Sequence, residues 1–292
     1  MADQYQLDMW VYETLRGSYR QGVRVLRTLF SGKSDFQQVD IIETKDYGRM
    51  LLNDGLFMLS EKDEFVYHDM IAHVPLFTHP NPKTVLIIGG GDGGTAREVL
   101  RHAEVEKVVM VEIDRMVVDA CREFIPQTSS ALTDARLELH IDDGVKYVKE
   151  TDKKFDVVIV DSTDPIGPAA PLFDTVFYKN VYNILAEDGI CVSQAETPWD
   201  PEDVQSYMLK NQKEVFPHLY LYMYANMMYP GGHWCFGFAS KKYNPVRDLD
   251  VERVKKSGLE CIYYNEDVHK AAFMLPTYMR KKFRAYLDEV AW

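Results

Sequence analysis

The sequence predicts an α/β protein in which a small N-terminal β-domain precedes a larger domain built on a doubly wound, mostly parallel sheet. Between residues 1 and 75, short apolar runs alternate with turn-forming residues, as in antiparallel sheets. From Lys83 onward, short apolar runs alternate with segments of helical periodicity. Repeated strand–helix units of this kind form a parallel sheet with helices on both faces. We therefore predict one domain over residues 1–75 and a second over residues 76–292.

Three strands and a helix are predicted in the N-terminal domain. The strands are Val39–Thr44, Arg49–Leu52 and Leu56–Leu59. The segment Ser60–Asp63 then begins a helix, because Ser60 can cap it and Asp63 supplies an acid three residues later.

The larger domain is predicted from a longer series of elements. Its strands are Val85–Ile88, Lys107–Val111, Leu137–Ile141, Phe155–Val160, Gly189–Ser193, Leu219–Ala225 and Trp234–Ala239. Its helices are Thr95–His102, Met116–Phe124, Phe177–Leu185, Pro201–Val215, Val251–Ser257 and Pro276–Val290. The first strand is a continuous apolar run, as expected for a strand buried on both faces. Ligands of such sheets bind at the carboxyl ends of the strands.

Composition argues against several classes of protein. The net charge of −12 opposes binding to nucleic acid, which depends on lysine and arginine. No stretch approaches the roughly 20 apolar residues that span a bilayer, and the opening MADQYQLDMW lacks the layout of a secretory signal. The four cysteines form no CxxC pair and are expected to be reduced thiols. We therefore expect a cytoplasmic protein that binds neither nucleic acid nor membrane.

A glycine-rich loop, Gly89–Gly94, joins the first strand of the larger domain to its first helix. Its glycines fit the pattern G-x-G-x-x-G, and Glu112 follows about 20 residues later at the end of the next strand. This pattern alone indicates a dinucleotide site. So many glycines in one turn also indicate that something approaches the backbone closely.

Acidic side chains argue against a dinucleotide. They stand at the ends of the first four strands, at Asp92, Glu112, Asp142, Asp143, Asp161 and Asp164. A pyrophosphate favours a helix N-terminus free of acids, whereas opposite unit charges about 4 Å apart attract by about 4 kcal/mol at an effective dielectric of 20. We therefore expect a cationic ligand. Magnesium is one alternative, but the Asp161–Pro168 loop has no basic residue for the phosphate substrate expected with it.

A sulfonium nucleoside fits these residues better than a metal does. Glu112 can accept hydrogen bonds from the ribose hydroxyls, Asp143 can accept one from the adenine amine, and Asp92 can hold an amino group. Cofactors of the S-adenosylmethionine type carry no phosphate, so Asp92 does not oppose them.

Several segments resemble those of one known family. They are Phe36–Gln37, Ser60–His68, Val85–Gly94, Met110–Asp114, Ile141–Gly144, Asp161–Ala169, Leu172–Phe173, Gln194, Tyr229–Gly232 and Tyr263–Asn265. The motif DSTDPIGPA at its distance from the glycine loop is highly specific. From about Phe36 to Tyr278, the chain resembles the polyamine aminopropyltransferases, the family of the spermidine synthases.

The resemblance implies a methyltransferase-like Rossmann domain and a transferase. The enzyme would move the aminopropyl group of a co-substrate, decarboxylated S-adenosylmethionine, to putrescine, giving spermidine and methylthioadenosine. The implied donor-binding residues are Gln37, Asp92, Glu112, Asp143, Gly144 and Pro168. The implied substrate-binding residues are Tyr67, His68, Asp92, Asp161, Asp164 and Tyr229, with Asp161 as the proton acceptor. A homodimer or homotetramer is implied, with no metal and no tightly bound cofactor.

Chemistry supports the role of Asp161 independently. The acceptor is an alkylamine with a pKa near 10.4, so only about one molecule in a few thousand is neutral at pH 7. A carboxylate within hydrogen-bond reach can accept the proton that the amine loses. Aromatic faces at Tyr67, Tyr229 and Trp234 favour a cationic chain, with core packing as the alternative for each ring.

Two departures from the family pattern concern the acceptor. Met58 stands where the family usually has glutamine, and Met227-Met228 stands where Pro-Thr is common. Methionine adapts to irregular pockets, which leaves cadaverine and agmatine open as acceptors. A putrescine N-methyltransferase and a non-catalytic polyamine-binding protein are the alternatives of other classes. No role is assigned to His233, which is expected at the surface or in a pocket wall.

Overall fold

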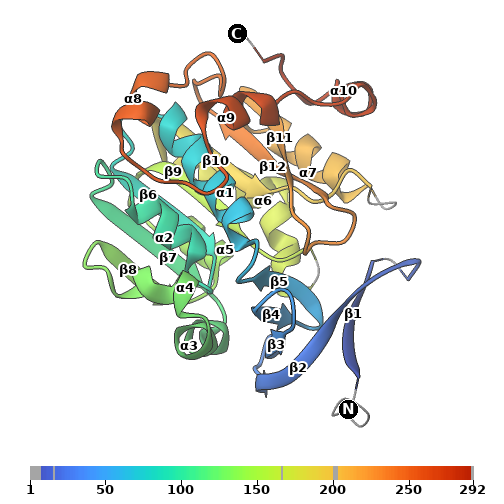
Figure 1. Cartoon of the computed structure of the whole chain (residues 1–292). Coiled ribbons are helices and arrows are strands. Elements are labelled where there is room, and N and C mark those ends of the chain that lie inside the picture. The colour runs from blue at the N-terminus through green and yellow to red at the C-terminus, as the bar shows by residue number, and fades with distance from the viewer. Residues whose placement is uncertain (1–7, 16, 166, 200–202, 291–292) are drawn as a thin grey trace.

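The computed structural model describes residues 8–15, 17–165, 167–199 and 203–290. Within these ranges the chain forms a five-stranded antiparallel sheet, followed by a seven-stranded mixed sheet with helices on both faces (Figure 1). The predicted fold class is thereby confirmed.

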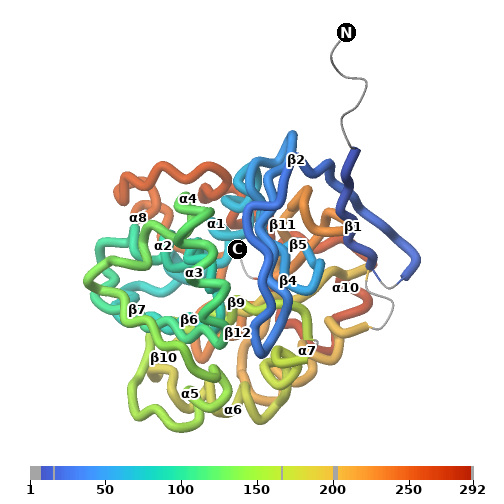
Figure 2. The backbone as a smooth tube through the Cα atoms, turned by 90° about the horizontal axis from the view of Figure 1, so that it is seen from below, coloured from blue at the N-terminus to red at the C-terminus, as the bar shows by residue number. Residues whose placement is uncertain are grey.

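The small sheet pairs each strand with its neighbour in sequence, in the order β1-β2-β3-β4-β5. Its strands are β1 (Met9–Leu15), β2 (Tyr19–Lys33), β3 (Gln38–Thr44), β4 (Arg49–Asn53) and β5 (Leu56–Ser60). The three predicted strands correspond to β3, β4 and β5 and differ from each by one residue at one end. The sequence pattern does not predict β1 or β2. These two strands form a long hairpin at one edge of the small sheet (Figures 1 and 2).

The large sheet has the strand order β8-β7-β6-β9-β10-β12-β11. Its strands are β6 (Thr84–Gly89), β7 (Lys107–Glu112), β8 (Leu137–Ile141), β9 (Phe155–Asp161), β10 (Leu185–Gln194), β11 (His218–Ala225) and β12 (His233–Ser240). Strands β6 to β10 pair in parallel, and β12 runs antiparallel to both β10 and β11. The chain passes from β6 to β7 and β8, and then returns to the other side of β6 at β9. The carboxyl ends of β6 and β9 therefore flank the crevice where such sheets bind ligands.

Helices pack on both faces of the large sheet. They are α1 (Glu64–Thr78), α2 (Gly94–Leu100), α3 (Arg115–Phe124), α4 (Pro126–Ser129), α5 (Gly144–Glu150), α6 (Thr175–Ile184), α7 (Val204–Lys213), α8 (Val251–Lys256), α9 (Glu266–Ala272) and α10 (Thr277–Phe283), with 3₁₀ helices over Ser130–Thr133 and Gly167–Phe173. Along β6, Val85 and Ile87 share one apolar core with α1 and α2, whereas Leu86 and Ile88 share another with α5 and α6. The sheet is thus held between two helical layers, as its uninterrupted apolar strands predict.

Helix α1 begins later than predicted. Ser60 is the last residue of β5, and its hydroxyl donates to Asp63 Oδ1 at 2.6 Å, so it does not cap the helix. The helix runs from Glu64 to Thr78 and packs its apolar side chains on the large sheet. The predicted domain boundary between residues 75 and 76 falls inside this helix, and the division itself remains a prediction.

Other helix bounds also differ from the prediction. The helix predicted over Pro276–Val290 is too long, because α10 ends at Phe283. Helix α7 begins at Val204, and the first residue predicted for it, Pro201, lies outside the described residues. The sequence pattern also misses α4, α5 and α9. Among the helices that the structure describes, none has an apolar stretch of the length needed to cross a membrane.

Candidate active site

A cavity of about 1310 Å³, its mouth included, opens at the carboxyl ends of β6, β7 and β9, against β4 and β5 of the small sheet. All the site residues that the family resemblance implies line it. They are Gln37, Tyr67, His68, Asp92, Glu112, Asp143, Gly144, Asp161, Asp164, Pro168 and Tyr229. Residues from both sheets and from α1 thus meet at one place. Ile166, within the DSTDPIGPA motif, lies outside the described residues.

The glycine-rich loop makes room for the other residues of the site. At Gly89, where φ is +83°, a Cβ atom would lie 2.1 Å from the carbonyl oxygen of Asp161. At Gly94, the first residue of α2, a Cβ atom would lie 2.2 Å from the His68 ring. Glycine at these positions therefore allows β9 and α1 to approach the loop closely. This approach brings Asp161 and His68 next to Asp92.

Asp161 ends β9 and is held by two hydroxyl groups. Its Oδ1 accepts a hydrogen bond from the Tyr67 hydroxyl at 2.7 Å, and its Oδ2 accepts one from Thr95 at 2.6 Å. Burial and the nearby Asp92 carboxylate raise the pKa of Asp161, while His68 and the two hydroxyls oppose the rise. Each carboxylate oxygen retains a second acceptor site, so Asp161 can accept a proton from a ligand.

His68 lies between two carboxylates. Its Nδ1 is 2.5 Å from Glu64 Oε2, and its Nε2 is 3.4 Å from Asp92 Oδ1. Glu64 also accepts hydrogen bonds from both Nη atoms of Arg97 at 2.9 Å. Burial disfavours a charged imidazole, but Asp92 and Glu64 outweigh burial and raise the pKa of His68 to about 10. His68 is therefore an imidazolium at neutral pH and offsets part of the negative charge of Asp92.

Glu112 ends β7 and is buried. Its Oε1 accepts the backbone N–H of Asp114 at 2.8 Å. Burial, followed by the charges of Asp114 and Asp161, raises the pKa of Glu112 to about 7. Asp114 Oδ2 accepts hydrogen bonds from Ser34 at 2.7 Å and from Gln37 Nε2 at 3.0 Å. Asp114 thus ties the small sheet to the end of β7, which places Gln37 at the same cavity as Glu112.

Of the two acids predicted after β8, Asp143 is the one that lines the cavity. It caps α5, because its Oδ1 accepts the backbone N–H of Val145 at 2.8 Å. At Gly144 a Cβ atom would lie 2.5 Å from Ile88 Cγ2, so glycine lets α5 begin close to β6. Asp142 instead pairs with Lys146 at 3.3 Å near the surface.

Aromatic side chains form one wall of the cavity. The Tyr67 ring meets those of Tyr224 and Tyr229 edge to face, with centroids 5.7 and 6.1 Å apart. Tyr229 also contacts Trp234 at 5.2 Å, and its hydroxyl donates to the Met58 carbonyl at 2.7 Å. Tyr67, Tyr224, Tyr229 and Trp234 all line the cavity. Such faces attract a cationic chain.

Glu13 is a cavity residue that the sequence pattern does not predict. It belongs to β1, and its Oε2 accepts the backbone N–H of Phe57 at 2.6 Å. Burial, together with the charge of Asp164, raises the pKa of Glu13 to about 7, although the Phe57 hydrogen bond opposes this rise. The one local feature of the sequence that could have indicated Glu13 as a site residue is its place as an acid within an apolar, aromatic-rich segment.

The methionines that depart from the family pattern lie in different environments. Met58 lines the cavity. Met228 is fully buried in an apolar cluster with the small sheet, Met227 is 63% exposed, and neither is among the described lining residues. Met58 is therefore the one of the three that can contact a ligand directly. His233 is exposed at the start of β12.

Carboxylates dominate the charge of the cavity. They are Glu13, Asp92, Glu112, Asp143, Asp161 and Asp164. Among the described lining residues there is no lysine or arginine, and His68 supplies the positive charge. One ligand atom each from His68, Asp92 and Asp161 lies within 4.8 Å of the others, so a single cationic group can contact all three. The cavity therefore favours cations and disfavours phosphates.

Two family models match the chain. Residues 9–61 match the spermidine synthase tetramerisation domain, and residues 64–250 match the spermine/spermidine synthase domain. The polyamine aminopropyltransferase of Clostridium beijerinckii is 45% identical over 284 residues, which are 97% of this chain and 100% of that protein. The polyamine aminopropyltransferase of Clostridium perfringens is 47% identical over 277 residues, which are 94% of this chain and 98% of that protein.

Solved structures agree with these matches. The crystal structure of spermidine synthase from Thermotoga maritima has a TM-score of 0.92 and 43% identity, and the match covers 97% of this chain and 96% of that one. A spermidine synthase in complex with the transition state analogue AdoDATO has a TM-score of 0.94 and 43% identity, over 97% of both chains. The chain therefore belongs to the spermine/spermidine synthase family and is an aminopropyltransferase.

Proposed function

We propose that this aminopropyltransferase moves the aminopropyl group of decarboxylated S-adenosylmethionine to putrescine, giving spermidine and methylthioadenosine. The observation that carries the proposal is the cavity, which combines six carboxylates with an aromatic wall and has no lysine or arginine among its described lining residues. Such a site favours ligands that carry ammonium and sulfonium groups. A related spermidine synthase has been solved with the transition state analogue AdoDATO, which supports a donor of this kind.

The nucleoside part of the donor is assigned to the ends of β7 and β8. The ribose hydroxyls would donate to Glu112 and offset the cost of burying its charge, a cost that raises the pKa of Glu112 to about 7. The adenine amine would donate to Asp143. Gln37, Gly144 and Pro168 would complete the donor site, since all three line the same cavity.

The amino group of the donor is assigned to Asp92. An ammonium there would lie close to the Asp161 carboxylate as well, because both acids belong to the group within 4.8 Å. S-adenosylmethionine itself carries a carboxylate beside this amino group, which Asp92 would repel. The charge of Asp92 therefore favours the decarboxylated donor and argues against a putrescine N-methyltransferase.

The acceptor is assigned to the space between Asp161, Asp164 and the aromatic wall. As its nitrogen bonds to the donor carbon next to sulfur, the carbon–sulfur bond breaks and methylthioadenosine leaves. Asp161 would take the proton that the nitrogen loses. The far ammonium of the acceptor would lie near Glu13, and the chain would pass along Tyr67 and Tyr229. Because the sulfonium already activates the carbon, alignment of the two substrates is the main task of the protein.

A product assay tests the proposal. The enzyme is incubated with either decarboxylated or ordinary S-adenosylmethionine as donor. Each donor is paired in turn with putrescine, cadaverine, agmatine or spermidine, and products are identified by mass. We expect methylthioadenosine and spermidine, with putrescine the fastest acceptor. A faster reaction with cadaverine or agmatine would correct the acceptor alone. A methylated diamine formed from S-adenosylmethionine would instead favour the N-methyltransferase, and would contradict the proposed donor.

We also propose that the enzyme acts as a homodimer or homotetramer in the cytoplasm. The match of residues 9–61 to a tetramerisation domain supports an oligomer. Trp10, Tyr12 and Tyr19 are exposed on the β1–β2 hairpin and offer apolar surface for such contacts. Light scattering of the purified protein gives the number of subunits, and a monomer would contradict this proposal.

A further inference from the structure

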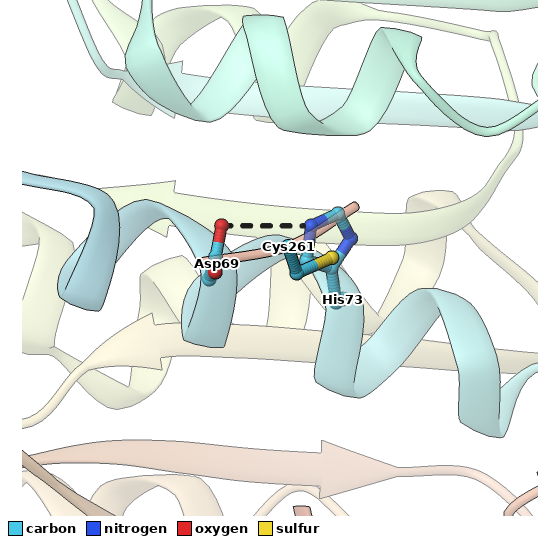
Figure 3. A group of neighbouring side chains, drawn as sticks. All are labelled: Asp69, His73 and Cys261. Atoms are coloured by element: carbon cyan, nitrogen blue, oxygen red, sulfur yellow. Dashed lines mark ion pairs between the residues drawn. The ribbon is translucent and has the colours of Figure 1, made fainter. Parts of the chain in front are cut away.

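Helix α1 carries a second group of metal-ligand side chains. Asp69 and His73 lie one turn apart on the helix, and Cys261 lies beside them in the segment between α8 and α9 (Figure 3). One ligand atom from each residue lies within 4.8 Å of the others, and His73 Nε2 is 3.8 Å from Asp69 Oδ1. None of the three is among the described residues that line the catalytic cavity.

We propose that Asp69, His73 and Cys261 bind a zinc-class divalent cation. Thiolate, imidazole and carboxylate are the ligands of protein zinc sites, and a thiolate selects against magnesium and calcium. In a tetrahedral site with bonds of about 2.0–2.3 Å, ligand atoms lie about 3.5 Å apart. A shift of about 1 Å would therefore close the group around the ion. Cys261 lies outside regular secondary structure, where its side chain can make this shift.

The other atoms of these ligands are already held in place. His73 Nδ1 is 2.8 Å from His102 Nε2, which orients the ring. His73 Nε2 lies 3.1 Å from Glu98 Oε2, and a bound cation would replace this contact. Asp69 Oδ2 accepts the backbone N–H groups of Tyr263 and Tyr264 at 2.8 and 3.1 Å, which leaves Oδ1. Outer hydrogen bonds of this kind orient the ligands of protein metal sites.

The neighbouring charges are compatible with a bound cation. Glu98 Oε2 is 3.1 Å from His73 Nε2, but Glu98 also pairs with Arg97 at 2.7 Å and with Arg101 at 2.5 Å. The carboxylate of Asp69 and the thiolate of Cys261 would together balance a doubly charged ion. The thiol proton of Cys261 would be released to solvent on binding.

A second cavity, of about 490 Å³ with its mouth included, is lined by Cys261, Tyr264 and Phe77 among others. Of the three ligand residues, Cys261 is the one among its described lining, so the cavity approaches the group from the Cys261 side. Water on that side would supply the fourth ligand. The bound cation would tie α1, which also carries Tyr67 and His68, to the segment that precedes α9. Without a cation, the contacts of His73 Nε2 with the carboxylates of Asp69 and Glu98 stand by themselves and give Cys261 no part.

Metal binding distinguishes a true cation site from a group of side chains that binds no cation. The full-length protein is first stripped of metal with a chelator and then titrated with Co²⁺ and Zn²⁺. Cobalt held by a thiolate gives a sulfur-to-metal absorption band in the near ultraviolet, which the sulfur-free group of His68, Asp92 and Asp161 does not produce. We expect about one equivalent of Co²⁺ to give the band, Zn²⁺ to displace it, and Zn²⁺ to raise Tm.

Variants assign the site to its residues. Cys261→Ser should abolish the band and weaken zinc binding by about tenfold or more. Cys191→Ala is the matched control, because it removes a thiol from the apolar core around β10, and it should keep both the band and the zinc-dependent rise in Tm. Metal-free Cys261→Ser should retain wild-type aminopropyl transfer. No band in the wild type, or unchanged zinc affinity in Cys261→Ser, overturns the proposal.

Discussion

Replacement of Asp161 by asparagine tests the proposed proton acceptor while changing little else. The asparagine carbonyl can still accept the Tyr67 hydroxyl, now at 2.7 Å, and its amide can donate to Thr95, whose hydroxyl can turn to accept. The negative charge is lost. A carboxylate about 4 Å from an ammonium contributes about 4 kcal/mol at an effective dielectric of 20, and each 1.36 kcal/mol is a factor of about ten in rate. We therefore expect turnover to fall by about 10²- to 10⁴-fold, the usual range for general base catalysis.

The thermal stability of Asp161→Asn shows whether a loss of turnover comes from the lost proton acceptor or from a damaged fold. Burial and Asp92 raise the pKa of Asp161, so its ionisation disfavours the folded state. A carboxyl group of this kind stabilises the fold below its unfolded pKa, and that contribution is lost as pH rises through the folded pKa. At pH 7, Asp161→Asn should therefore leave Tm unchanged or raise it.

Turnover is measured as the release of methylthioadenosine when both substrates are saturating. Donor binding is measured by calorimetry, and in Asp161→Asn it should be largely retained. Asp164→Asn is the matched control: it removes a charge from the same loop, and should raise the KM of the acceptor more than it lowers turnover. Alkaline pH should restore a larger share of the Asp161→Asn rate, because more acceptor arrives neutral. Near-normal turnover of Asp161→Asn at pH 7 would refute the proton-acceptor role and direct the search to Tyr67 and Asp164.

Three further substitutions test the remaining assignments. Glu112→Gln should weaken donor binding by about 10- to 100-fold, the value of a hydrogen bond to a charged group, and unchanged calorimetric affinity would count against the ribose assignment. Asp92→Asn should narrow the preference for decarboxylated over ordinary S-adenosylmethionine by about tenfold or more, because like charges in contact cost several kcal/mol; equal affinities in the wild type would contradict this. Glu13→Gln should raise the KM of putrescine and leave donor affinity unchanged. Because burial raises the Glu13 pKa from 4.5 to about 7, its contribution to stability is lost between these two pH values. As pH rises from 4.5 to about 7, the unfolding free energy of the wild type should therefore fall by up to about 3 kcal/mol more than that of Glu13→Gln. If the two pH–stability curves are parallel, Glu13 is not buried as described.

The strands that could be predicted are those whose apolar side chains face this chain's own core. β6 is a continuous apolar run buried on both faces, and β8 alternates apolar and polar residues, so each sequence by itself predicts a strand. β1 is different, because Trp10 and Tyr12 are exposed and its one buried residue is the acid Glu13. Its pattern therefore points away from the core, and local sequence does not distinguish it from a loop.

The end of the chain shows how tertiary contacts shorten a helix. The segment after Phe283 has good helix-forming residues, and the prediction continues the helix to Val290. In the structure, Asp288 Oδ2 accepts the backbone N–H of Leu219 at 2.8 Å, and the Asp288 N–H donates to the Leu219 carbonyl at 2.8 Å. These contacts with the edge strand β11 replace the hydrogen bonds that a longer helix would have made, and no pattern within the segment reveals them.

The two ends of the cavity also differ in how far the sequence alone predicts their residues. Acids that follow parallel strands reach one edge of the sheet whatever the details of packing, so the meeting of Glu112, Asp143 and Asp161 at one cavity could be predicted from strand ends. Glu13 reaches the cavity only because the small sheet is docked in one register, in which Gln21 Nε2 donates to the Met227 and Met228 carbonyls at 2.9 and 2.7 Å. The far end of the proposed acceptor site thus depends on a contact between two sheets. Substitutions at Gln21 that shift this contact should therefore change the choice among diamines while donor affinity stays constant, and a parallel loss of donor affinity would show that the two ends are not independent.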